Sequence, residues 1–406
     1  MTEQVAEIAI IGAGPAGAFL ASRLAEAGRD AVLFDPKGAW EKPCGGGVPT
    51  RALREYARLL NRTEYPRKLI RRVTLVSPDM RRITIDFDEP FAIYSRQVLN
   101  GLVLDRAIES GTRFIRAAVT DFKRHADHWQ ITTDGGQSWR ARFLVGADGA
   151  ASPTRRKLVG IFPKQDLALA FGYNVKMGDA EKTPATDGSM QLQGEPQDEV
   201  VVQFLRDFTG YVWAFPRPGV MNFGVASKLG ERTSDELRGI LKQFVGDYYG
   251  GQLPAADRLS FFGAKIPTLD YASWRELKTI GEGWALIGDA AGFADPITGE
   301  GIYYAFRSAD LMAEALLQAS ANAYSMATAK YEQDWRAAFG HDLERASRRL
   351  PLFYRGRFFG RRFTDAMILL AKYHRGVRRV LVRAVVGYQS YATLKRELLR
   401  NVLRVF

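Results

Sequence analysis

The sequence has only one cysteine, Cys44, and four histidines in 406 residues. A single cysteine cannot form a disulfide within the chain, so the composition fits a reducing compartment such as the cytoplasm. None of the histidines belongs to a metal-ligand spacing, and we expect no metal site (His125, His128, His341, His374). The sequence also lacks an apolar run of roughly 20 residues for a membrane-spanning helix, and a basic segment before an apolar core that would mark a secretory signal.

The charge of the chain is unevenly distributed. Apolar residues make up 46% and charged residues 25%, as in globular proteins, and the net charge is +12. From Arg345 to Phe406 the chain has fourteen arginines and two lysines against Asp365 and Glu397, which gives +14 and leaves −2 for the rest. The basic character therefore belongs to the C-terminal region.

A glycine-rich turn lies close to the N-terminus. An apolar strand is expected from Glu7 to Ile11, a helix from about Pro15 to Ala27 and a second strand from Ala31 to Phe34. The turn between the first strand and the helix has G-x-G-x-x-G spacing, and an acid ends the second strand (Gly12, Gly14, Ala16, Gly17, Asp35). This context predicts a dinucleotide site in which helix N–H groups bind a pyrophosphate and the acid binds a ribose.

Three further segments have the character of loops around a ligand. The first holds three glycines between two prolines, from Pro43 to Pro49, and contains Cys44, Gly45 and Gly46. The second follows an expected strand that ends at Val145 and contains Asp148 and Gly149. The third follows another expected strand, Trp284 to Ile287, and opens a long helix (Gly288, Asp289, Gly299, Gly301, Ile302).

The middle of the chain, from about Ala168 to Ser273, reads as an antiparallel meander with one helix from Ser234 to Tyr249. Its second strand alternates aromatic side chains, which would share one face of the sheet (Tyr211, Trp213, Phe215). Such a face could bind an extended hydrocarbon, or it could be part of the core of the meander.

Taken together, these motifs resemble the glutathione-reductase-type flavoproteins, in the branch of aromatic hydroxylases and geranylgeranyl reductases. The resemblance covers roughly Ile8 to Leu317 and implies FAD binding by the first glycine motif with Asp35, by Arg96 near the diphosphate, by Asp148, and by Gly288 and Asp289. The aspartate usual at Asn100 is absent. Pro296 to Ile302 would border the isoalloxazine ring.

Two features are similar to the geranylgeranyl reductase family in particular. One is the P-C-G-G loop at Pro43 to Gly46, and the other is Y-x-W-x-F-P at Tyr211 to Pro216, followed by N-x-G from Asn222. Glu300 departs from the family, because several relatives have only glycines in that loop. The resemblance implies a hydride transfer from N5 of reduced FAD to a C=C bond of an isoprenoid or similar lipid, with Cys44 as proton donor or positioning residue, or alternatively as a packing residue. NADPH or a ferredoxin-like protein would supply the electrons.

Other functions fit parts of the sequence. An FAD-dependent monooxygenase of an aromatic or polycyclic substrate would use the same cofactor motifs. A flavin-dependent halogenase would carry a W-x-W-x-I-P motif, which Tyr211 to Pro216 only approximates. A lipid-surface protein with a relict flavin fold would be a non-enzymatic alternative.

The basic C-terminal region has three interpretations. Apolar residues alternate with arginines in helical spacing, as in segments that lie on anionic membranes. The region could equally be a helical subdomain with a solvated basic face, whereas nucleic-acid binding lacks a recognisable module. We expect a lipid or other hydrophobic substrate and no nucleic-acid partner, while peripheral association with an anionic membrane and a solvated helical subdomain both stay open for the basic region.

The predicted fold class is α/β, with a Rossmann-type FAD-binding domain, an inserted antiparallel β-sheet domain and a C-terminal helical region. The predicted boundaries are 1–165 and 276–335 for the FAD-binding domain, 166–275 for the substrate domain and 336–406 for the basic region. Within the first part, Thr50 is expected to cap a helix through about Leu60, and another helix is expected from Asn100 to Ser110.

Overall fold

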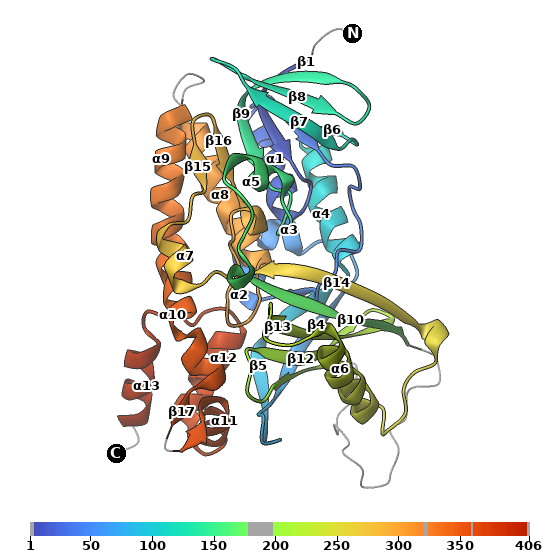
Figure 1. Ribbon diagram of the computed structural model, residues 1–406, viewed down its shortest axis with the longest axis vertical. Coiled ribbons are helices and arrows are strands. Elements are labelled where there is room, and N and C mark those ends of the chain that lie inside the picture. Colours follow the sequence, from blue (N-terminus) through green and yellow to red (C-terminus); the bar gives the residue numbers. More distant parts are fainter. Residues whose placement is uncertain (1–3, 178–197, 320–323, 359, 404–406) are drawn as a thin grey trace.

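The structure is a computed structural model that describes residues 4–177, 198–319, 324–358 and 360–403. It is a mixed α/β fold, as predicted, with two large sheets and a group of C-terminal helices (Figure 1). Among these residues, no helix is both long and apolar enough to cross a bilayer.

The first sheet carries the predicted nucleotide-binding motif. Its central strand β1 (Gln4–Ile11) pairs in parallel with β2 (Ala31–Phe34) and β9 (Ser138–Gly146), so the loops after these strands meet at one edge. The order continues to β6 (Arg113–Ile115) on one side, and to β16 (Trp284–Leu286) and β15 (Ile280–Gly281) on the other. A hairpin of β7 (Val119–Arg124) and β8 (Trp129–Thr133) extends from β9.

Helices cover this sheet and complete its core. Buried alanine and leucine side chains of α1 (Pro15–Glu26) and α8 (Ile302–Gln318) belong to the same apolar cluster as the strands. The remaining elements around it are α2 (Thr50–Glu55), α3 (Ala57–Leu60), α4 (Arg96–Glu109), α5 (Pro153–Leu158), α7 (Tyr271–Arg275), α9 (Tyr324–Trp335) and the short η1 (Lys164–Asp166) and η3 (Gly288–Ala290).

The second sheet contains the predicted meander and more. Its order is β14 (Leu259–Pro267), β10 (Leu167–Lys176), β13 (Val220–Lys228), β12 (Gly210–Arg217), β11 (Glu199–Phe204), β4 (Arg67–Val76), β5 (Arg82–Tyr94) and β3 (Gly47–Val48). Helix α6 (Ser234–Tyr248), preceding η2 (Ala256–Arg258), packs on β13. Strands from the first hundred residues thus share this sheet with strands after residue 166; the domain boundaries themselves stay a prediction.

The C-terminal region is helical. It comprises a π-helical turn η4 (Arg336–Gly340), α10 (His341–Arg355), α11 (Phe363–Tyr373), α12 (Arg375–Val385) and α13 (Leu394–Leu403), with a small hairpin of β17 (Arg357–Phe358) and β18 (Arg361–Arg362). Apolar side chains of α10, α11 and α12 form one buried cluster with β4, β5 and β11. Figure 1 shows α11, α12 and α13 at the end of the molecule opposite the β1 sheet.

Two local predictions differ from the structure. Thr50 was expected to cap a helix through Leu60, but it is the first residue of α2, and its hydroxyl donates to the Pro90 carbonyl oxygen. The helix is also interrupted at Tyr56, before α3. Helix α4 begins at Arg96, four residues before the predicted Asn100, because Ser95 caps it.

Candidate active site

The glycine turn after β1 is shaped by the backbone around it. Gly12 has φ +105°, and a Cβ there would lie 2.5 Å from the Ala147 carbonyl oxygen, so only glycine fits. A Cβ on Gly17 would lie 1.9 Å from the Gly12 carbonyl oxygen, which keeps α1 close to β1. Gly14 is the N-cap of α1 and lines a cavity; a Cβ on Gly14 would have no atom within 4 Å. Space and free N–H groups therefore meet where the sequence predicts a phosphate.

Asp35 lies beside this turn at the end of β2. One carboxylate oxygen accepts from the Ala13 N–H at 2.9 Å, and the other accepts from the N–H groups of Lys37 and Gly38 at 2.8 Å each. These bonds fix the carboxylate at the cavity wall. Its predicted contact with a ribose stays a prediction.

Arg96 and Asp148 line the same cavity. Arg96 is almost completely buried; its Nη2 donates to Asn100 Oδ1 at 3.2 Å, while its Nε has no partner among the described residues. Asp148 accepts from the Thr154 N–H at 2.9 Å and from the Ser152 hydroxyl, and burial raises its pKa. A buried guanidinium with an unused donor fits the anionic diphosphate that an FAD site must hold.

The last predicted cofactor motif closes the cavity from the side of α8. Asp289 forms an ion pair with Lys42 (2.9 Å between Nζ and Oδ2), which links this motif to the Cys44 loop. Gly288 does not line the cavity: its N–H donates to the Ser308 hydroxyl at 3.0 Å, and a Cβ would lie 3.0 Å from that of Ala16. Gly17 is likewise structural, and the other predicted site residues all line the cavity.

The cavity has a volume of about 1800 Å³ and runs from the glycine turn to the C-terminal helices. Such a volume exceeds that of an ordinary small-molecule pocket and can hold a dinucleotide with a further ligand. At the end away from the glycine turn, its walls are apolar side chains of the second sheet and the C-terminal helices, among them Val73, Leu75, Phe91, Val202, Phe204, Phe353, Met367, Val380, Leu381 and Leu398.

The Cys44 loop is held rigidly at the middle of the cavity. Gly46 has φ +81°, and a Cβ there would lie 2.0 Å from the Tyr94 carbonyl oxygen. The Tyr94 N–H donates to the Gly46 carbonyl oxygen at 3.0 Å, and the next residues form β3 against β5. The Cys44 Sγ accepts from the Gly46 N–H at 3.3 Å. The thiol therefore has a fixed position.

An ion pair beneath this loop was not predicted. The Arg217 side chain, 3% exposed, bonds Glu41 (2.7 Å) and donates to the Cys44 carbonyl oxygen. Burial disfavours the charged form of Glu41, but the Ser95 hydroxyl, Arg217 and N–H groups of α4 outweigh it and lower its pKa. Burial lowers the pKa of Arg217. Neither residue belongs to a recognisable motif, so only the fold reveals their positioning role.

The aromatic residues of β12 span the two loops. The Phe215 ring packs under Gly45, where a Cβ would lie 2.8 Å from ring carbons, and the Tyr211 hydroxyl donates to the Thr298 carbonyl oxygen. Trp213 lies between them, with centroids 5.8 Å from Tyr211 and 6.1 Å from Phe215, and its indole N–H donates to Asn222 Oδ1 at 2.8 Å. All three line the cavity, and they also join apolar clusters of the sheet; their contact with a hydrocarbon stays a prediction.

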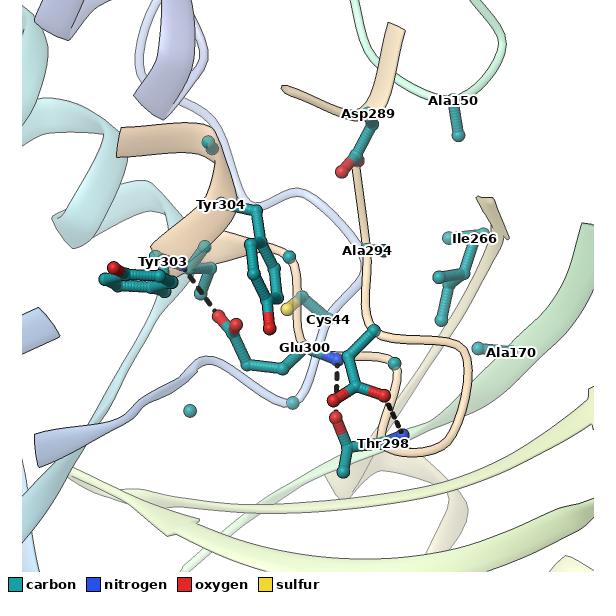
Figure 2. Close-up of a pocket in the computed structure, with 18 of the residues that line it drawn as sticks. Cys44, Ala150, Ala170, Ile266, Asp289, Ala294, Thr298, Glu300, Tyr303 and Tyr304 are labelled. Carbon is teal, nitrogen blue, oxygen red and sulfur yellow. Dashed lines mark hydrogen bonds between the residues drawn. The ribbon is translucent and has the colours of Figure 1, made fainter. Parts of the chain in front are cut away.

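The loop before α8 contains two acidic residues, Asp295 and Glu300. Figure 2 shows Cys44, Glu300 and Tyr304 directed into the cavity. Glu300 Oε1 accepts from the Tyr303 N–H at 2.8 Å, and burial raises the pKa of Glu300 to about 8. Asp295 accepts from the Ile297 N–H and from the Tyr391 hydroxyl, both at 2.8 Å, and burial raises its pKa. Glu300, a carboxyl that retains its proton near neutral pH, thus borders the centre of the cavity, and Asp295, whose pKa is also raised by burial, lies five residues before it.

Glu300→Gln is expected to change the pH dependence of stability. The carboxyl is protonated in the folded protein up to about pH 8 but ionises near pH 4.5 once unfolded, so the wild-type protein loses stability as pH rises across this window. Glutamine does not ionise and removes this loss. Near pH 8, the free energy of unfolding of the variant should exceed that of the wild type by on the order of a few kcal/mol. Urea unfolding across the window measures the difference, with exposed Glu282→Gln as control. If the free energy of unfolding of Glu300→Gln and of the wild type changed in parallel with pH, Glu300 would not be the group with the raised pKa.

The fold and this site define an FAD-dependent oxidoreductase, and the comparisons with known proteins agree. Residues 5–347 match the family model described as FAD binding domain, and the chain belongs to this family. A geranylgeranyl diphosphate reductase from Synechocystis is 27% identical over 363 residues, which cover 83% of this chain and 82% of the relative. A menaquinone reductase from Mycobacterium tuberculosis is 29% identical over 334 residues, 77% of this chain and 76% of the relative. The resemblance to geranylgeranyl reductases is thus confirmed.

Solved structures confirm the fold. A geranylgeranyl bacteriochlorophyll reductase-like protein from Thermoplasma acidophilum superposes with TM-score 0.74 at 18% identity, covering 99% of this chain and 96% of that chain. A probable FAD-dependent monooxygenase from Pseudomonas aeruginosa gives 0.64 at 18% identity, with 90% and 100% covered. A variant of a flavin-dependent brominase gives 0.68 at 17% identity, with 98% of each chain covered. One fold thus accompanies three reaction types.

Proposed function

We propose that this FAD-dependent oxidoreductase saturates C=C bonds of an isoprenoid or similar lipid. The observation that carries the proposal is the apolar half of the cavity, which continues from the Cys44 loop past the β12 aromatics to the C-terminal helices. An extended hydrocarbon fits this shape better than a compact aromatic molecule does. The two relatives are named as reductases of geranylgeranyl diphosphate and of menaquinone, and both names refer to isoprenoid compounds. These names support the same substrate class.

The residues of the chain have separate tasks in this reaction. FAD, held by the glycine turn, Arg96 and the Asp289 loop, would when bound and reduced supply a hydride to one alkene carbon, and the protein must supply a proton to the other. We assign that proton to Cys44, and the position of its thiol on the cavity wall, held by the Gly46 N–H, supports this role. The β12 rings hold the chain in an apolar channel from which water is excluded, so the alkene can be positioned closely. NADPH or a ferredoxin-like protein would reduce the flavin.

Anaerobic reoxidation of the flavin tests this function. The reduced protein is mixed with geranylgeranyl diphosphate, and the return of oxidised flavin absorbance is followed. We expect substrate-dependent reoxidation, and none with the fully saturated analogue, which offers no double bond. Equal reoxidation by both compounds, or by neither, would rule out reduction of this alkene.

Trp213→Leu is expected to weaken lipid binding while FAD is retained. Loss of most of the aromatic contact should raise KM for the isoprenoid roughly 10- to 100-fold, as the burial of a large apolar side chain predicts. Trp129→Leu is the matched control, since Trp129 is also buried and its indole N–H also has a carbonyl partner, Gly283, but it does not line the cavity. An unchanged KM in Trp213→Leu would assign this side chain to the core alone.

A further inference from the structure

The apolar end of the cavity opens at the molecular surface between α10 and α13. Leu352 of α10 and Leu399 of α13 both line the cavity, yet each is 52% exposed. Lys395, one turn before Leu399, also lines the cavity and is exposed. Side chains that face both the cavity and solvent mark an opening, and this opening has an apolar rim with a positive charge.

The surface of the neighbouring helices has the same mixed character. Leu370 and Tyr373, one turn apart on α11, are 45% and 77% exposed. Exposed apolar side chains that gather on one region are typical of an interaction surface. Helices α11, α12 and α13 pack on each other in sequence order, so these residues belong to the same end of the molecule as the opening (Figure 1).

Exposed arginines accompany these apolar side chains. Arg375 and Arg379 lie one turn apart on α12, and Arg396 and Arg400 lie one turn apart on α13, and all four are exposed. The region from Arg345 onward has a net charge of +14, while the rest of the chain has −2. An anionic surface therefore attracts this end alone, whereas a second copy of the same basic surface would be repelled.

We infer that the C-terminal helices dock on an anionic phospholipid bilayer, with the opening between α10 and α13 directed at the lipid. The exposed apolar side chains enter the interface and the arginines bind lipid phosphates. A lipid substrate then passes from the bilayer into the cavity without crossing water. The passage of substrate rests on the proposed function; the docking does not.

Flotation of the full protein with vesicles tests the docking without any substrate. We expect binding to phosphatidylcholine vesicles that contain phosphatidylglycerol and little binding to phosphatidylcholine alone. The double variant Arg396→Glu with Arg400→Glu should bind the anionic vesicles at least about 25-fold more weakly, on the scale of about 1 kcal/mol per basic side chain near the membrane. The control Arg58→Glu with Lys242→Glu changes the net charge equally, at exposed positions on α3 and α6.

The outcomes separate docking from catalysis. Equal weakening by both double variants would show non-specific charge attraction and overturn the proposal, as would equal binding to both kinds of vesicle. Association of the protein with itself that Arg396→Glu with Arg400→Glu abolishes, without vesicle binding, would assign the surface to a second copy. Because neither arginine lines the cavity, this variant should keep its activity on detergent-solubilised substrate. If docking is confirmed but the alkene is not reduced, the proposed function fails and the docking remains.

Discussion

Gly14→Val should give a folded protein that no longer holds FAD. Gly14 has extended backbone angles (φ −68°, ψ −179°), which any residue adopts, and no atom lies within 4 Å of the position of a Cβ. The valine side chain would instead fill the cavity in front of the α1 N-terminus, where the cofactor phosphates must approach the backbone. Loss of two charge-assisted hydrogen bonds at about 1.5 to 3 kcal/mol each weakens FAD binding at least about 100-fold.

Two measurements separate this effect from misfolding. The bound flavin is measured from its absorbance relative to protein after gel filtration, and Tm is measured on the stripped protein. Gly239→Val is the control, because Gly239 on α6 likewise has no atom within 4 Å of a Cβ but lies outside the cavity. A Gly14→Val protein that retains its full flavin content would refute the placement of the diphosphate.

Cys44→Ala should abolish most of the lipid-dependent reoxidation while FAD remains bound. If the Cys44 thiol protonates the alkene carbon, its removal costs about 100- to 10,000-fold in rate, the usual contribution of a positioned general acid. Few contacts are lost, since the loop is fixed by the Gly46 backbone, β3 and Arg217 rather than by the thiol. Stability should therefore change little.

The split between rate and affinity shows which role Cys44 has. Loss in kcat with an unchanged KM identifies a proton donor, whereas a raised KM alone identifies a residue that positions the alkene. Cys44→Ser keeps the size and a donor but has a far less acidic group, so it should be nearly as slow as alanine. An alanine variant with wild-type kcat and KM would leave Cys44 as a packing residue.

The first half of the site could be predicted because its signals are local. Gly12, Gly14 and Gly17 stand between an apolar strand and a helix, and the observed β1, α1 and β2 follow the predicted bounds closely. Predictions from local sequence fail where a side chain bonds a residue far away in the chain. Thr50 has the side chain of a helix cap, but its hydroxyl bonds Pro90, forty residues away.

The second half of the site depends on tertiary contacts. Arg217 stabilises the Cys44 loop across more than 170 residues, and no spacing in the sequence indicates that pair. Helical periodicity and charge predicted the C-terminal helices, but not that their apolar faces would complete the cavity or that Tyr391 would bond Asp295. Which face of a helix meets which sheet is decided by packing between segments, and that information is spread over the whole chain.

The central claim is reduction of a C=C bond, and the mass of the product tests it most directly. The reduced protein is incubated with geranylgeranyl diphosphate without oxygen, and the recovered lipid is analysed by mass spectrometry. The account predicts a product heavier by a pair of hydrogens for each bond reduced, formed without oxygen and strongly diminished in Cys44→Ala. Unchanged lipid under these conditions, together with a product heavier by one oxygen atom once air is admitted, would contradict it and identify a monooxygenase.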